Sequence, residues 1–205
     1  EGYNHVATYD YLRAIRGRLP PLRQLFVEAA ERNQLDWHLL AAVGYQESHW
    51  KPAAASPTGV RGIMMLTLPT AEQLGVDNRL DPAQSIAGGA RYLRRMIDRI
   101  PDPVKRPDRV WMALAAYNIG YQHLMDARVL TRRQGGDPDR WADVKERLPL
   151  LSRRNHYTTL DHGYARGWMA VRYVENIRIY HSILTWMDQR NHPLIVDANA
   201  PDTTT

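Results

Sequence analysis

Apolar residues recur at spacings of three and four along nearly the whole chain, and this periodicity constrains the fold more than any other feature. Valine, isoleucine and threonine do not gather into alternating runs bounded by turns, as they would in half-buried strands. A period near 3.6 residues places apolar side chains on one face of a helix. The sequence therefore predicts an all-α fold, and its 205 residues are of ordinary size for one domain.

Start and stop signals divide the chain into helices. Asp81 and Pro82 are a typical N-cap and first-turn proline, and Gln84 follows as a capping-box partner, so a helix is predicted to about residue 99. Asp36 is the predicted N-cap of a helix that ends at Ser48. The remaining predicted helices cover about 21–32, 70–74, 108–118, 121–134, 140–148 and 166–189.

The two ends of the chain are assigned outside the folded domain, and the C-terminal end, with its prolines and threonines, lacks this periodicity. Residues 1–20 are predicted to be a linker or N-terminal extension, 21–190 the folded domain, and 191–205 a flexible tail. The start at Glu1 carries neither a basic nor an apolar signal region, so we expect a processed or excised fragment. No apolar run approaches the roughly 20 residues that a membrane-spanning helix needs.

Composition restricts the possible ligands. A net charge of +5 favours polyanionic surfaces such as nucleic acid, anionic lipid or the carboxylate-bearing peptides of a cell wall. The basic residues are scattered in short pairs, whereas a nucleic-acid reader concentrates them on one element, so we expect no nucleic-acid partner.

The chain has no cysteine, and its eight histidines show no HExxH pattern, so no metal site is predicted. Phosphate-binding motifs are also missing; Gly88-Gly89 is interpreted as a close packing contact, and no cofactor is expected.

Glu47 is the candidate catalytic residue. Most glutamates on helices are solvated, but Glu47 shares a face with Leu40 and Val43 and stands where a helix gives way to a loop rich in proline and glycine. Burial of a carboxylate on an apolar face raises its pKa toward the range that a general acid requires. This is the electrostatic arrangement of acids that cleave glycosides.

Four ordered motifs resemble those of the soluble-lytic-transglycosylase family. They are Gln46-Glu47-Ser48, Ser56-Pro57-Thr58-Gly59, Gly62-Ile63-Met64-Met65 and Ala116-Tyr117-Asn118-Ile119-Gly120. The resemblance spans about 35–180 and implies a lysozyme-like helical domain of the goose-type or Slt-like kind, with a substrate cleft. The segments 44–66 and 164–179 look closest to a membrane-bound member in which a solute-binding-like module precedes the catalytic one. We therefore expect a regulatory N-terminal module that this chain does not include.

The resemblance also implies roles for individual residues. Glu47 is the expected sole acid and base, and Ser56 is expected to reach toward the sugar's N-acetyl group. The other expected substrate-binding residues are Met64, Met65, Tyr117, Asn118 and Tyr173. The alternative for each tyrosine is a core aromatic with a satisfied hydroxyl.

The sequence departs from the family pattern at two places. Many members have Gly-Leu-Met-Gln where this chain ends in Met65, so an amide that would bind substrate is replaced by a thioether. The apolar run 63–66 predicts a pocket in which a glutamine at position 65 would be buried without a partner. Met169 and Ala170 stand where the wider family often has Glu-Thr, so no second carboxylate is expected from that helix.

The function implied by the resemblance is lytic cleavage of peptidoglycan. The bond between N-acetylmuramic acid and N-acetylglucosamine would break without water and leave a 1,6-anhydro end, with glycan strands and stem peptides as partners. The expected location is the periplasm of a Gram-negative bacterium, in association with the outer membrane in the full-length protein. One alternative is a hydrolytic muramidase with Asp77 or Asp81 as base. Others are a catalytically inactive peptidoglycan-binding module and, less favoured, a nucleic-acid binder.

Overall fold

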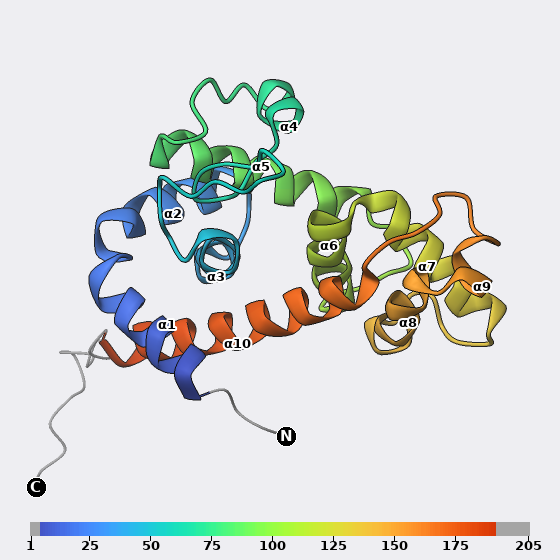
Figure 1. The fold of residues 1–205 in the computed structure, drawn as a ribbon. Helices are drawn as coiled ribbons and strands as arrows, with labels where there is room; N and C mark the ends of the chain where they lie inside the picture. Colours follow the sequence, from blue (N-terminus) through green and yellow to red (C-terminus); the bar gives the residue numbers. More distant parts are fainter. Residues whose placement is uncertain (1–4, 192–205) are drawn as a thin grey trace, which may run out of the picture.

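Helices dominate the structure, a computed structural model that describes residues 5–191 (Figure 1). Within that range there is no β-strand; the only strand-like pairs are isolated bridges from Arg61 to Ala55 and to Leu66. The predicted all-α class is therefore confirmed. None of the helices in the described range is long and apolar enough to cross a membrane.

The helices follow one another along the chain from α1 to α10, with one 3-10 helix between α8 and α9. They are α1 (His5–Gly17), α2 (Pro20–Arg32), α3 (Trp37–Ser48), α4 (Leu68–Gln73), α5 (Pro82–Arg99), α6 (Asp108–Ile119), α7 (Tyr121–Arg133), α8 (Trp141–Arg147), the 3-10 helix η1 (Leu148–Ser152), α9 (Arg154–Tyr157) and α10 (Gly167–Asn191).

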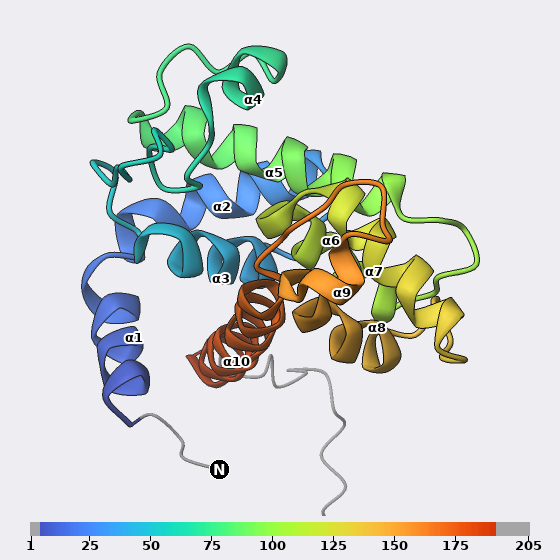
Figure 2. The same cartoon turned by 45° about the vertical axis from the view of Figure 1, so that its right-hand side comes forward.

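Helix α3 lies at the centre of the larger half of the molecule. Its residues from Leu39 to Tyr45 are all buried, as is expected for a helix that is apolar nearly all round. It packs between α2 and α10, and α5 lies across α2 and α6. Helix α10 runs along one side of the whole fold and contacts α3, α6 and η1, whereas α7, α8, η1 and α9 gather at the far end (Figures 1 and 2). Thus α10 joins the two halves.

The predicted caps are present. Asp36 accepts a hydrogen bond from the His38 backbone N–H, and Asp81 accepts one from that of Gln84, both at 2.8 Å. The Gln84 side chain differs from a capping-box partner, because its Oε1 accepts the backbone N–H groups of Asp77 and Asn78 at 3.0 Å. It therefore anchors the loop before α5 instead of closing the cap.

The expectation for 1–20 is corrected in its described part. Residues 5–17 form α1, and Tyr11 is fully buried, with its hydroxyl donating to the Tyr180 carbonyl at 3.0 Å. The Tyr11 ring also contacts Tyr45 and Trp50. This segment therefore packs on the core and is not a linker. The short elements η1 and α9 were also not predicted, and the expected tail lies outside the described residues from 192 onward.

Candidate active site

Glu47 lies in the last turn of α3, and the end of that helix fixes its position. The chain leaves the helix through His49 and Trp50, which both have positive φ, 53° and 57°. The Trp50 indole is buried, and its Nε1 donates to the Ala41 carbonyl at 2.8 Å. A strained turn of this kind persists only where its surroundings hold it, and in this protein the buried indole does so.

Tyr173 of α10 is the hydrogen-bond partner of Glu47. Its hydroxyl donates to Glu47 Oε1 at 2.5 Å, although the two residues are 126 positions apart. Burial raises the pKa of Glu47 to about 7, and the hydrogen bond from Tyr173 opposes that rise by stabilising the carboxylate. A carboxyl with this pKa exists in both protonation states near neutral pH, so it can both donate and accept a proton.

Tyr117 of α6 lies close to the same carboxyl. Its hydroxyl donates to the Met64 carbonyl at 3.1 Å, and its ring meets that of Tyr92 edge to face. Burial, and after it the charge of Glu47, raise the pKa of Tyr117 and of Tyr173 well above the ordinary value. Both tyrosines therefore stay protonated over the whole working range of pH.

The loop between α3 and α4 forms the opposite wall. Ser56 Oγ lies 2.7 Å from Thr58 Oγ1. The Arg79 guanidinium donates to the carbonyls of Gly59 and Leu66 at 2.8 and 2.9 Å, which ties the middle of the loop to its C-terminal end. The loop is therefore held in one shape beside Glu47.

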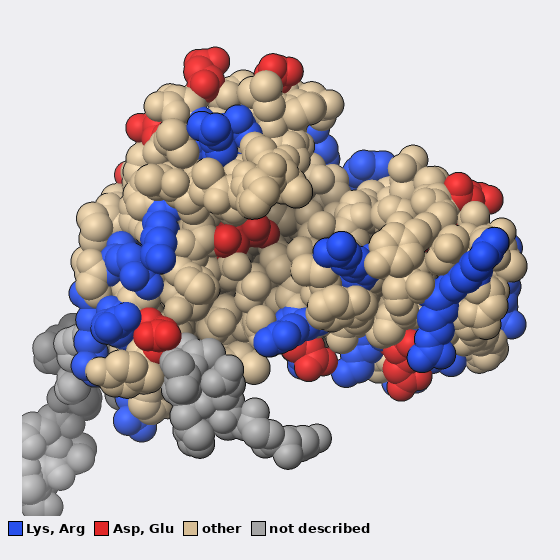
Figure 3. Space-filling view, viewed as in Figure 1, with Lys and Arg blue, Asp and Glu red and all other residues tan. Residues whose placement is uncertain are grey.

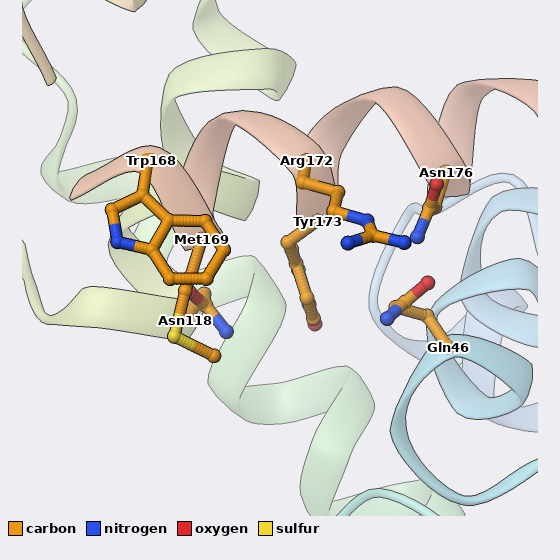
Figure 4. Close-up of a pocket in the computed structure, with 7 residues that line it drawn as sticks. All are labelled: Gln46, Asn118, Trp168, Met169, Arg172, Tyr173 and Asn176. Atoms are coloured by element: carbon orange, nitrogen blue, oxygen red, sulfur yellow. The ribbon is translucent and has the colours of Figure 1, made fainter. Parts of the chain in front are cut away.

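Two adjoining cavities meet at this site. The larger, about 460 Å³, is lined by Glu47, Ser56, Thr58, Val60, Met65, Leu66, Thr67, Thr70, Tyr92, Tyr117, Asn118 and Met169. The smaller, about 340 Å³, is lined by Gln46, Asn118, Trp168, Met169, Arg172, Tyr173 and Asn176 (Figure 4). Asn118 and Met169 line both, so the cavities are parts of one cleft. Figure 3 shows a hollow on this face, with acidic atoms at its centre and basic atoms beside it.

Glu47 is the only carboxylate among the described residues that line the two cavities. Asp77 is exposed and Asp81 caps α5, and neither lines the cleft. Residues 5–191 also contain no group of three or more His, Cys, Asp or Glu side chains placed to hold a metal ion. The cleft thus presents one titrating acid, surrounded by hydroxyl and amide groups.

Six of the seven predicted site residues line this cleft: Glu47, Ser56, Met65, Tyr117, Asn118 and Tyr173. The expectation for Met64 is corrected, because its side chain is fully buried and only its carbonyl contacts Tyr117. The reason lies in α5: a Cβ on Gly89 would stand 2.5 Å from Met64 Cγ, so the missing side chain makes room for the methionine. The interpretation of Gly88-Gly89 as a close packing contact is confirmed.

Several residues of the cleft were not predicted. They are Gln46, Thr58, Val60, Leu66, Thr67, Thr70, Tyr92, Trp168, Met169, Arg172 and Asn176. Trp168, Arg172 and Asn176 follow one another at intervals of four, which places them on one face of α10. That spacing was a usable signal, because Tyr173 on the same helix was already a candidate.

Met65 does not stand in the apolar pocket that the sequence predicts. It is partly exposed, and Ser56, Thr58, Thr67 and Thr70 line the same cavity with hydroxyl groups. Ile63 and Met64 are buried and line neither cavity, whereas Leu66, also buried, borders the same cavity as Met65. A polar group at position 65 would therefore meet hydroxyls or solvent.

We expect the free energy of unfolding of Met65→Gln to lie within about 1 kcal/mol of that of the wild type, because the new amide is not buried without a partner. Turnover of a glycan substrate should hold or rise by up to about tenfold, the value of one ordinary hydrogen bond. Thermal unfolding and steady-state kinetics, with Met65→Leu as the control of similar size, measure both effects. A clear loss of stability in Met65→Gln but not in Met65→Leu would indicate that the pocket around position 65 is apolar after all.

We expect Tyr173→Phe to lower kcat by about tenfold or more, since a hydrogen bond to a charged group contributes about 1.5 to 3 kcal/mol. Without the hydroxyl the Glu47 carboxylate loses a stabilising donor, so the pKa of Glu47 rises above 7. The alkaline limb of the kcat–pH profile should therefore move to higher pH. An unchanged profile and an unchanged kcat would return Tyr173 to a purely structural role.

The helical architecture of the described residues, with a cleft between α3, α6 and α10, is that of a lysozyme-like domain. The described fold is similar to that of an inactive glutamate-to-glutamine mutant of lytic transglycosylase Slt from Pseudomonas aeruginosa, with a TM-score of 0.58 and 22% identity. That alignment covers 83% of this chain and 24% of the other, and it supports the fold alone.

The sequence profile of the transglycosylase SLT domain matches residues 24–139, and the chain belongs to that family. It is 57% identical over 190 residues to membrane-bound lytic murein transglycosylase F 1 of Alkalilimnicola ehrlichii, and 56% identical over 198 residues to membrane-bound lytic murein transglycosylase F of Saccharophagus degradans. These matches cover 90% and 94% of this chain but only 38% and 40% of the relatives. The predicted resemblance to the family and to a membrane-bound member is confirmed.

Proposed function

We propose that this domain is a peptidoglycan lytic transglycosylase, in which Glu47 acts first as acid and then as base. The observation that carries the proposal is the geometry of Glu47, whose carboxyl accepts a hydrogen bond from Tyr173 and has no second carboxylate in its cleft, within the described residues. Burial, which raises the pKa of this carboxyl to about 7, supports the same role. The family and the names of its relatives support the same reaction class.

The reaction begins with protonated Glu47. Its proton passes to the oxygen between N-acetylmuramic acid and N-acetylglucosamine, and the bond from that oxygen to C1 breaks while the sugar's own acetamide oxygen bonds to C1. The carboxylate of Glu47 then takes the proton from O6, and O6 displaces the acetamide oxygen from C1. The product is a 1,6-anhydro ring, Glu47 is protonated again, and no water is consumed.

The other groups in the cleft orient the sugar. The hydroxyl of Tyr173 already donates to Glu47, and Ser56 and Asn118 offer polar atoms within the same two cavities. Tyr117 and Tyr173 stay protonated, and their single O–H groups are donated to the Met64 carbonyl and to Glu47. Their hydroxyl oxygens can still accept hydrogen bonds, so they can orient the acetamide N–H or the hydroxymethyl group without taking part in proton transfer.

The setting of the reaction is also a proposal. Since the relatives are named as membrane-bound lytic murein transglycosylases, we infer a periplasmic cell-wall enzyme. This chain spans about two fifths of the length of those relatives. Outer-membrane association and a regulatory module would belong to the parts of such a protein that this chain does not include.

Digestion of purified peptidoglycan followed by mass spectrometry tests the proposed activity. The expected fragments end in 1,6-anhydro-N-acetylmuramic acid and are lighter by one water than the products of a muramidase. Fragments with free reducing ends would favour the hydrolytic alternative. Binding without any release of fragments would favour an inactive peptidoglycan-binding module.

A further inference from the structure

Arg172 places a cation in the cleft that the proposed reaction does not use. It lies on α10 next to Tyr173, lines the smaller cavity and has an exposed side chain (Figure 4). Among residues 5–191 no carboxylate pairs with it; Glu175, less than one turn further on, lies 3.3 Å from Lys145 instead. The guanidinium is therefore available to a ligand, and its planar fork of donors matches a carboxylate.

The neighbours of Arg172 define the chemistry of this part of the cleft. Trp168 and Asn176 lie four residues before and after it on the same helix face, and Gln46 of α3 lines the cavity with them (Figure 4). Trp168 is 49% exposed, and its indole offers a flat apolar surface to a sugar ring. The amides of Gln46 and Asn176 can donate and accept hydrogen bonds. An exposed indole, two amides and a cation together fit a sugar that carries an acidic substituent.

We propose that Arg172 is a specificity-determining residue, which binds a carboxylate of the stem peptide on the glycan strand. This inference rests on the proposed function, and it adds that the enzyme prefers peptide-bearing strands to bare glycan. In a peptide-bearing strand the lactyl carboxyl is held in the amide bond to the peptide, and the carboxylates are those of the peptide itself. Removal of the peptide leaves one carboxylate per N-acetylmuramic acid, on the lactyl group. The cavity opens directly beside Tyr173, so the bound peptide would belong to a sugar next to the scissile bond.

Arg172 has no part in the proton transfers. The pKa of Glu47 is set by burial and by the hydrogen bond from Tyr173, and Arg172 contributes to neither. Loss of the Arg172 charge should therefore change substrate affinity and leave the pH dependence of kcat as it is. This separates a role in peptide binding from an indirect effect on the catalytic acid.

The test compares two substrates: glycan strands with intact stem peptides, and the same strands stripped by an amidase. Arg172→Gln should lower kcat/KM on the peptide-bearing strands by about 5- to 20-fold, mainly through KM, as expected for an exposed charge-assisted contact. On stripped strands the peptide carboxylates are gone and only the lactyl carboxylate on the sugar remains, so if Arg172 binds the peptide its replacement should leave the kinetics within about twofold of the wild type. Arg172→Lys keeps the positive charge but lacks the planar guanidinium, so its kcat/KM on peptide-bearing strands should lie between those of the wild type and Arg172→Gln.

Arg190→Gln is the matched control, because Arg190 is exposed, lies on the same helix and lines neither cavity of the cleft. It should match the wild type on both substrates. Equal losses for Arg172→Gln on both substrates, no loss on either, or a shifted kcat–pH profile would each overturn the inference. A wild-type protein that cleaves neither substrate would instead contradict the proposed function.

Discussion

Glu47→Gln is expected to lower kcat by about 10²- to 10⁴-fold, the usual contribution of acid–base catalysis. Glutamine keeps the shape of the side chain but can neither give a proton to the leaving oxygen nor take one from O6. The described residues lining the cleft contain no other carboxylate that could replace it. Both halves of the reaction should therefore fail together.

The same variant should remain folded. Burial raises the folded-state pKa of Glu47 above that of an ordinary carboxyl, so the wild type loses stability as the pH rises through about 7. Glutamine carries no charge, and Glu47→Gln should melt at or above the wild-type temperature at pH 8. Glu31→Gln, the same change at an exposed site on α2, should leave kcat unchanged. More than about a tenth of wild-type turnover in Glu47→Gln would remove Glu47 from the mechanism.

Gly62→Ala is expected to lower the free energy of unfolding by about 3 kcal/mol or more. Gly62 has a φ of +82°, and a Cβ there would stand 1.8 Å from the Arg79 carbonyl oxygen and 2.8 Å from Ser85 Oγ. The backbone atom cannot rotate away, so the loop or the start of α5 must move. Ser85 also accepts the Met64 backbone N–H at 3.2 Å, and that contact would be lost with the movement.

Gly59→Ala separates the collision from the backbone strain. Gly59 has a similar φ of +86°, but a Cβ there would meet nothing within 4 Å. Its substitution should cost only about 1 kcal/mol, from the left-handed conformation itself. Chemical denaturation of both variants gives the two free energies, and equal values would show that the close approach to Arg79 is not what requires glycine at position 62.

Local signals in the sequence were enough to place the helix that bears Glu47. Asp36 caps α3, the apolar face continues to Glu47, and the proline- and glycine-rich loop follows, as the structure has it. Tyr173 could be added only through the family resemblance, because no local pattern relates it to a residue 126 positions earlier.

Other features depend on contacts that the sequence pattern does not contain. The burial of Tyr11 in α1 comes from rings of α3 and α10 and from the Tyr180 carbonyl. In the loop that bears Met64 and Met65, neither a helical nor a strand period applies, so their opposite orientations could not be derived. Arg172 was missed although its spacing places it on one face of α10 with Trp168 and Asn176, because an exposed arginine on a helix is ordinary until the cavity beside it is known.

Cleavage of peptidoglycan in ¹⁸O-labelled water tests whether O6, deprotonated by Glu47, attacks C1 in place of water. The products should be reduced with borohydride at once, so that free reducing ends cannot exchange oxygen with the solvent. We expect anhydro ends without label and resistant to reduction, formed by the wild type and not by Glu47→Gln. Labelled, reducible N-acetylmuramic acid ends released by the wild type would contradict it.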